Sequence, residues 1–246
     1  LSRLVGSEMC IRDRIKTDFL NRGSGLMAIL FQEEVHSHLS ERQKQKQTLV
    51  RYWKNSRMIT SERILKAFME IPREYFVETS FADQAYADHP LPIGEGQTIS
   101  QPTTVMLMLQ LLEVEPEHRV LEIGAGCGYN AALLGLLAKE VVTIERHEKL
   151  AVLARANLRK AGISNVNVLA GDGKLGDLEH SPSNRIIVTA AAQNIPAQLK
   201  EQLALDGILL SPVGQSHRCE MLRIHKTPSN QFQTSTHGLF SFVPLV

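Results

Sequence analysis

The segment Val120–Asn130 (VLEIGAGCGYN) constrains the fold more than any other part of the chain. An apolar run that contains one acid, Glu122, leads into a glycine-rich stretch, and a second apolar run begins at Ala131. The glycines stand at alternate positions: Gly124, Gly126 and Gly128. A buried strand, a tight turn and a helix fit this order, and such a unit holds nucleotide-like ligands in a doubly wound sheet. The dinucleotide fingerprint G-x-G-x-x-G is not met, because Tyr129 occupies its third glycine position.

Strands and helices alternate along the chain from residue 119 onward. We predict strands at 119–123, 140–145, 166–169, 185–189 and 208–213, and helices at 128–138, 147–161 and 195–203. Two further segments, 219–226 and 232–245, are predicted to form antiparallel strands. Because strands that alternate with helices form parallel sheets through crossovers, we expect an α/β fold. It is predicted as a Rossmann-like, doubly wound, mostly parallel sheet with N-terminal helices and a C-terminal antiparallel strand pair.

The N-terminal part is predicted to be helical. We expect a surface helix within 33–56, a second helix that starts near Thr60 and ends at Pro72, a structured loop over 75–93 and a third helix from Pro102. Residues 27–246 are interpreted as one domain, with a helical part at 27–117 and the Rossmann-like core at 118–246. Residues 1–26 are interpreted as a non-native extension, because Leu1 to Arg14 resembles translated sequencing-adapter read-through and Met27 is a natural start. The alternative is a disordered native extension.

Composition excludes several classes of partner and site. The net charge of +1 gives no electrostatic reason to expect nucleic acid or an anionic membrane as the main partner. No apolar run approaches the ~20 residues that span a membrane. The three cysteines are far apart and the nine histidines show no ligand spacing, so neither disulfides nor a metal site are expected. A cytoplasmic location is the default expectation.

Two acids follow predicted strands at the ligand-binding edge. Glu145 comes 21 residues after Gly124, where a carboxylate can accept hydrogen bonds from both ribose hydroxyls. The alternative is a surface acid beside a helix start, but the glycine loop upstream favours the ribose role. Asp172, between Gly171 and Gly173, could accept from an adenine amino group; Asp-Gly is also an ordinary turn.

The segment Gln97–Pro102 (QTISQP) is not explained by generic folding. It carries two hydroxyls and two amides in an otherwise apolar neighbourhood, ahead of a predicted helix. A structural alternative is that Ser100 caps the helix and Pro102 begins it.

Several motifs together resemble the protein-L-isoaspartate O-methyltransferase family. These motifs are PREYFVE (72–78), LPIGEGQTISQP (91–102), RVLEIGAGCGY (119–129), GDG (171–173), RIIVTAAA (185–192) and FVPLV (242–246). The acid followed by G-x-G-x-G is similar to the first motif of S-adenosylmethionine-dependent methyltransferases in general, whereas GQTISQP is nearly specific to this family. The resemblance implies methylation of the free α-carboxylate of L-isoaspartyl residues in damaged proteins.

The resemblance also implies roles for individual residues. Ser100 matches the family's active-site serine. Substrate-binding positions are matched by Gln97, Thr98, Ile99, Val188, Thr189 and Ala190. Positions that bind S-adenosyl-L-methionine are matched by Glu122, Gly124, Gly126, Gly128, Glu145, Asp172 and Gly173. No metal is implied, and we expect a monomer.

One segment departs from the family's pattern. Bacterial members usually carry Ala-Pro-Phe/Tyr-Asp where this chain has Ser181-Pro182-Ser183-Asn184. The loss of an aromatic residue and an acid puts local packing and one hydrogen bond in doubt. Two alternatives therefore stay open: a methyltransferase of the same class retargeted to a small molecule or RNA, and a cofactor-binding module without catalysis.

Overall fold

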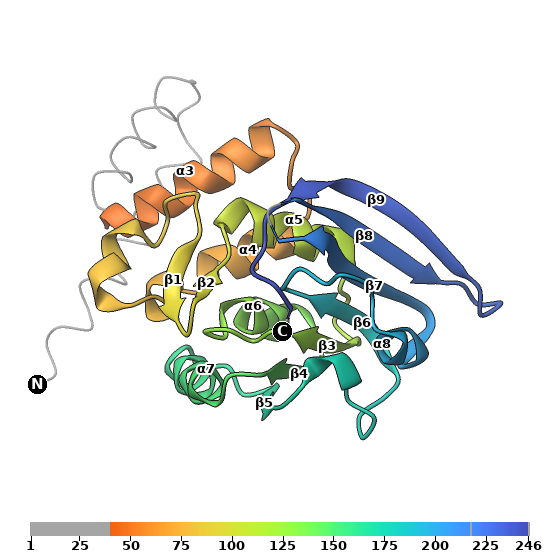
Figure 1. Ribbon diagram of the computed structural model, residues 1–246. Coiled ribbons are helices and arrows are strands. Elements are labelled where there is room, and N and C mark those ends of the chain that lie inside the picture. The colour runs from red at the N-terminus through yellow and green to blue at the C-terminus, as the bar shows by residue number, and fades with distance from the viewer. Residues whose placement is uncertain (1–39, 217, 246) are drawn as a thin grey trace, which may run out of the picture. The chain divides into compact units, whose positions relative to one another are not determined.

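Figure 1 shows the computed structural model, which describes residues 40–216 and 218–245. Backbone contacts divide the chain into two units, Leu1–Lys44 and Gln45–Val246. In the first unit, Ser40 and Gln43 form a reciprocal capping box: Gln43 N donates to Ser40 Oγ (3.3 Å), and Ser40 N donates to Gln43 Oε1 (3.0 Å). The interpretation of residues 1–26 lies outside the described residues. The sheet and the candidate site both belong to the second unit.

The second unit is built on a seven-stranded sheet in the order β5-β4-β3-β6-β7-β8-β9. The strands are β3 (Arg119–Ile123), β4 (Glu140–Glu145), β5 (Val166–Ala170), β6 (Ser183–Val188), β7 (Leu203–Gln215), β8 (Arg218–Lys226) and β9 (Phe232–Phe240). The first five pair in parallel, and β8 and β9 add an antiparallel hairpin at one edge (Figure 1). The predicted fold class is confirmed. Because β3 pairs with β4 on one side and β6 on the other, the switch point where such sheets bind ligands lies at the carboxyl ends of β3 and β6.

Both faces of the sheet bury apolar side chains, since successive strand residues point to opposite sides. One face packs Val120 and Val141 with helices α4 (Glu62–Glu70), α5 (Pro102–Leu112), α6 (Tyr129–Leu137) and α7 (Glu148–Lys160). The other face packs Leu121 and Ile123 with Leu199 of the short helix α8 (Ala197–Glu201). Trp53, the only tryptophan of the chain, comes from α3 (Glu41–Asn55) and belongs to the same apolar cluster as Val120 and Val141.

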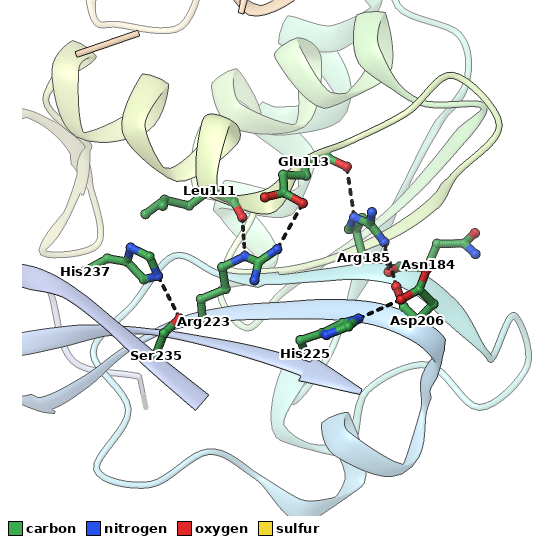
Figure 2. A network of polar contacts seen from close by, with 9 residues as sticks. All are labelled: Leu111, Glu113, Asn184, Arg185, Asp206, Arg223, His225, Ser235 and His237. Atoms are coloured by element: carbon green, nitrogen blue, oxygen red, sulfur yellow. Dashed lines mark hydrogen bonds and ion pairs between the residues drawn. The ribbon is translucent and has the colours of Figure 1, made fainter. Parts of the chain in front are cut away.

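Two arginines fasten the C-terminal end of α5 to the sheet (Figure 2). Arg223 Nε donates to Leu111 O at 3.0 Å, and its Nη2 lies 3.0 Å from Glu113 Oε2. Arg185 Nε donates to Glu113 O at 3.0 Å. These cations satisfy carbonyls that a helix end leaves without intrahelical partners, and they meet the negative end of the helix dipole.

The predicted loop over 75–93 contains regular structure that the sequence pattern did not reveal. It holds two 3-10 helices, η1 (Arg73–Tyr75, starting just before it) and η2 (Thr79–Gln84), and the first strand of the hairpin β1 (Leu91–Gly94) with β2 (Gln97–Ile99). The turn of this hairpin uses Gly94 and Gly96, both with positive φ. Segments this short offer too few residues for a period to appear.

The last third of the chain differs from prediction in the bounds of three elements, α8, β7 and β9. Helix α8 is shorter than 195–203, and β7 starts at Leu203, five residues before the predicted start at residue 208. The reason is pairing on both sides, since Leu203 lies opposite Ser183 and Gly207 opposite Lys226. Strand β9 ends at Phe240 rather than at residue 245, because the tail turns to pair with Ala191 instead: Ala191 N donates to Val243 O (2.7 Å) and Leu245 N to Ala191 O (2.8 Å).

Within the described residues, no helix combines the length and apolar character that crossing a membrane requires.

Candidate active site

A pocket opens at the switch point between β3 and β6. It is lined by Thr98, Ile99, Ser100, Val105, Met108, Gly124, Ala125, Gly126, Cys127, Tyr129, Asn130 and Thr189. The structure thus brings the QTISQP segment and the glycine loop to the walls of one pocket, although Ser100 and Gly124 come from different elements. Six of the predicted site residues line it: Thr98, Ile99, Ser100, Gly124, Gly126 and Thr189.

The glycine loop has the shape of an open cradle. Gly124, Gly126 and Gly128 all have positive φ, at 98°, 53° and 88°. A Cβ on Gly124 would lie 2.5 Å from Thr189 Oγ1, so no other residue fits there. Thr189 Oγ1 lies 2.7 Å from Gly124 O and 3.0 Å from Ile123 O. The Thr189 hydroxyl therefore donates its proton within the loop and holds it against the end of β6.

Glu145 lies at the carboxyl end of β4 and is only 5% exposed. Its carboxylate accepts from Gly126 N at 2.8 Å and from His147 N at 2.9 Å. A carboxylate has about four acceptor positions, so two are left for a ligand. The first of these bonds also ties Glu145 directly to the glycine loop.

Glu122 is completely buried and does not line the pocket. It accepts from Asn130 Nδ2 at 2.7 Å and from Thr143 Oγ1 at 2.6 Å. Burial raises the pKa of Glu122 to about 7, while these two hydrogen bonds oppose the shift and the nearby Glu145 adds to it. Glu122 therefore acts on the pocket through Asn130, which does line it.

The remaining predicted positions lie around the pocket rather than in its wall. Gly128 is the N-cap residue immediately before α6, and a Cβ there would lie 3.2 Å from the backbone of Ala154 in α7. Asp172 is exposed and accepts from Lys174 N at 3.0 Å, and Gly173 packs on Ile123. Gln97 is half-buried, and its side-chain amide lies 3.4 Å from Glu95 O. Val188 is buried in the core on the α8 face, and Ala190 is buried.

Ser100 lines the pocket. The residue is half-buried, and its Oγ makes no hydrogen bond to any described residue, whereas its carbonyl accepts from Arg73 Nη2 at 2.9 Å. Helix α5 starts just after Ser100. Asp88 caps its start by accepting from both Thr103 N (2.9 Å) and Thr103 Oγ1 (2.7 Å). Arg73 and Asp88 were not predicted as site residues. Arg73 does lie in the PREYFVE motif, which was the only sequence signal for either residue.

The side chains that line the pocket are suited to binding a ligand rather than to attacking it as nucleophiles. Burial raises the pKa of the Cys127 thiol to about 11, so this cysteine is a neutral packing group at physiological pH. No group of three or more His, Cys, Asp or Glu side chains that could hold a metal ion occurs in the described part of the chain. A glycine cradle after the first parallel strand, with a buried acid at the end of the next strand, defines a doubly wound protein that binds a nucleotide-like cofactor at its switch point.

Comparison with known proteins identifies the family. The family model for protein-L-isoaspartate(D-aspartate) O-methyltransferase matches residues 43–246. Protein-L-isoaspartate O-methyltransferases from Methanopyrus kandleri and Paracoccus denitrificans are 43% and 47% identical to this chain. The first alignment covers 82% of this chain and 91% of the relative, and the second covers 77% and 88%. The chain belongs to the protein-L-isoaspartate(D-aspartate) O-methyltransferase family.

Solved structures agree with this assignment. A structure of a protein-L-isoaspartate O-methyltransferase superposes with a TM-score of 0.73 at 31% identity, covering 82% of this chain and 65% of that chain. A Plasmodium falciparum structure, determined in complex with S-adenosyl-L-homocysteine, has a TM-score of 0.70 at 21% identity and covers 81% of this chain and 97% of that one. The second similarity supports the fold.

Proposed function

We propose that this chain transfers a methyl group from S-adenosyl-L-methionine to the free α-carboxylate of L-isoaspartyl residues in damaged proteins and peptides. The observation that carries the proposal is that Ser100 and the glycine cradle line the same pocket. Family membership supports the same reaction.

The residues at the switch point fit this cofactor. Gly124 and Gly126 leave the backbone open where a Cβ would close the cradle, and Glu145 retains acceptor capacity for ribose hydroxyls. The exposed Asp172 is proposed to accept from the adenine amino group, with Gly173 beside it. When bound, the cofactor supplies an activated methyl group on a sulfonium. Gly128 and Glu122 are proposed to shape the cradle, through the start of α6 and through Asn130.

The protein's part in the reaction is binding and orientation. A substrate carboxylate is ionised at neutral pH, so no general base is needed to activate it. The unpaired hydroxyl of Ser100 can donate to one carboxylate oxygen and leave the other free to react. Val105 and Met108 give the pocket an apolar wall that excludes water from a weak nucleophile.

The substrate backbone is proposed to lie along Gln97–Ile99 on one side and Val188–Ala190 on the other. Small side chains continue through Ala191 and Ala192, but their backbone groups are already engaged. Ala191 N donates to Val243 O at 2.7 Å and Ala192 N to Pro212 O at 3.0 Å. Backbone recognition of a peptide is therefore proposed to end near Ala190.

The segment Ser181–Asn184 departs from the family's sequence pattern, but its position does not favour a methyltransferase retargeted to a small molecule or RNA. It lies at the start of β6, whereas Thr189 of the pocket follows the end of that strand, roughly 20 Å away at about 3.3 Å per residue. Asn184 Oδ1 accepts from Arg119 N at 2.9 Å, so the amide at this position makes a hydrogen bond to the neighbouring strand β3. We further propose a cytoplasmic monomer whose partners are isoaspartyl proteins rather than nucleic acid or membranes.

The test compares two peptides that differ only in one linkage. We expect the protein to methylate an L-isoaspartyl peptide and not its aspartyl isomer, as measured by methyl transfer from labelled cofactor. Ser100→Ala should lower kcat on the order of 100-fold, because the carboxylate loses its orienting donor, with cofactor affinity nearly unchanged. Ser235→Ala, on exposed β9, is the matched control and should keep full activity. Equal labelling of both peptides, or of neither, would contradict the proposal.

A further inference from the structure

Arg73 is a fully buried arginine that holds two loops at once. It begins η1 and is 0% exposed. Its Nε donates to Ala85 O at 2.7 Å, and its Nη2 donates to Ser100 O at 2.9 Å. Because the guanidinium is a rigid planar fork, these bonds fix the two carbonyls relative to each other.

The same side chain also touches the glycine-loop side of the pocket. Arg73 Cζ lies over the Tyr129 ring, 4.9 Å from its centroid. Tyr129 begins α6 directly after the glycine loop and lines the pocket. Arg73 therefore spans from the carbonyl of Ser100 to the helix that follows the cradle.

Packing alone does not account for an arginine at this position. A buried guanidinium is costly unless an anion compensates it, and apolar residues of similar volume are often as stabilising or more so. Arg73 forms no ion pair with any described residue, and its Nη1 is buried without a hydrogen-bond partner. Burial lowers the pKa of Arg73, which reflects the same cost.

We propose that Arg73 is a positioning residue for the methyl transfer, acting through Ser100. Its hydrogen bond to the Ser100 carbonyl and its contact with Tyr129 set the Ser100 hydroxyl at a defined place relative to the cofactor cradle. Arg73 itself is fully buried and does not line the pocket. This inference rests on the proposed function, since it assigns the reaction's orienting hydroxyl to Ser100.

A double-mutant cycle tests whether Arg73 acts through Ser100. Arg73→Met in the wild-type background should lower kcat for the isoaspartyl peptide on the order of 30-fold or more, because a displacement of about 1 Å can cost 100-fold. In the Ser100→Ala background, the same substitution should cost less than about 3-fold, because coupled residues are not additive. Cofactor affinity, measured by calorimetry, should change less than about 3-fold in every variant.

The matched control is Arg185→Met. Arg185 is also a buried arginine (9% exposed), and its guanidinium donates to the carbonyls of Glu113 at 3.0 Å and Asn184 at 2.9 Å (Figure 2). It does not line the pocket. We expect a comparable loss of thermal stability with unchanged kcat. Arg73→Lys retains the charge and one donor and replaces Arg73→Met in the cycle if the latter does not fold. Lysine cannot reproduce the fork, so an intermediate loss of kcat is expected.

The outcomes separate this inference from the proposed function. If the wild-type protein does not distinguish the isoaspartyl peptide, the proposed function fails and the inference fails with it. If the wild-type protein does distinguish it but the cycle is additive, only the inference fails. A loss that appears in KM and persists in the Ser100→Ala background would also overturn it, because a long-range charge effect does not require the Ser100 hydroxyl.

Discussion

At the scale of single residues, the burial of Glu122 makes the stability of the fold depend on pH. Its carboxyl lies under the glycine loop with no exposed surface, bonded to Asn130 and Thr143. Burial raises its pKa from the usual 4.5 to about 7. Between these two values the folded protein holds a proton that the unfolded chain has released. Unfolding therefore becomes easier as the pH rises from about 4.5 to about 7, and changes no further above that range through this group.

A neutral replacement should remove this dependence. We expect Glu122→Gln to flatten the fall in unfolding free energy between about pH 4.5 and pH 7, a fall worth roughly 3 kcal/mol at 1.36 kcal/mol per pKa unit. Glutamine keeps the shape, and its amide can still face Asn130 and Thr143. Chemical denaturation at several pH values measures the effect, with exposed Glu201→Gln as the control. An unchanged slope in Glu122→Gln would mean that Glu122 is ionised throughout.

At the scale of elements, α5 is the helix that directly follows the segment containing Ser100. Its start is fixed by a chain of hydrogen bonds from other elements: Trp53 Nε1 donates to Thr103 Oγ1 at 2.8 Å, and Thr103 Oγ1 donates to Asp88 Oδ2 at 2.7 Å. Its end is fixed by Arg185 and Arg223. The helix is therefore held at both ends by side chains distant in sequence.

Thr103→Val should break the chain of bonds without changing side-chain shape. It leaves the buried Trp53 Nε1 without its acceptor, which costs about 1–3 kcal/mol of unfolding free energy. Thr104→Val is the matched control, because the neighbouring Thr104 is half-buried and makes one long bond (3.3 Å) to Gln101 Oε1. Denaturant unfolding measures both variants, and a shift in Trp53 emission should accompany only Thr103→Val. Equal destabilisation by both would assign the cost to the helix rather than to the bond.

At the scale of the whole molecule, one apolar cluster links the N-terminal helices to the sheet. It contains Trp53 of α3, Leu109 of α5, Leu133 of α6 and Met221 of β8. Helices α3, α5 and α6 and strand β8 thus share one interior over the described residues. Such shared burial makes unfolding cooperative.

We expect Trp53 fluorescence and far-UV circular dichroism to report one coincident unfolding transition. S-adenosyl-L-homocysteine at about 100 times its Kd should raise the unfolding free energy seen by both probes by about 2.7 kcal/mol. Urea titrations with and without this product measure the effect. If the product moved the circular dichroism transition while the Trp53 transition stayed in place, the helices and the sheet would be separate cooperative units.

The sequence by itself determined the class of fold and the position of the glycine loop. Both rest on short-range information: alternating apolar runs specify strands and helices, and glycines at alternate positions specify a turn with positive φ. The six predicted residues that line the pocket come from two such motifs and from the end of one strand. Boundaries were less predictable where pairing from both sides extended β7, and where the tail left β9 to pair with Ala191.

Only the tertiary structure decided how these motifs meet. Glu122 could have reached the cofactor directly from its place in the motif, but the alternation of β3 turns it into the buried face beside Thr143. Arg73 is 27 residues from Ser100, and no local pattern predicts that its guanidinium holds the serine's carbonyl. The physical reason is that a buried polar group takes whichever partner packing brings within reach, and packing joins segments that the sequence keeps apart.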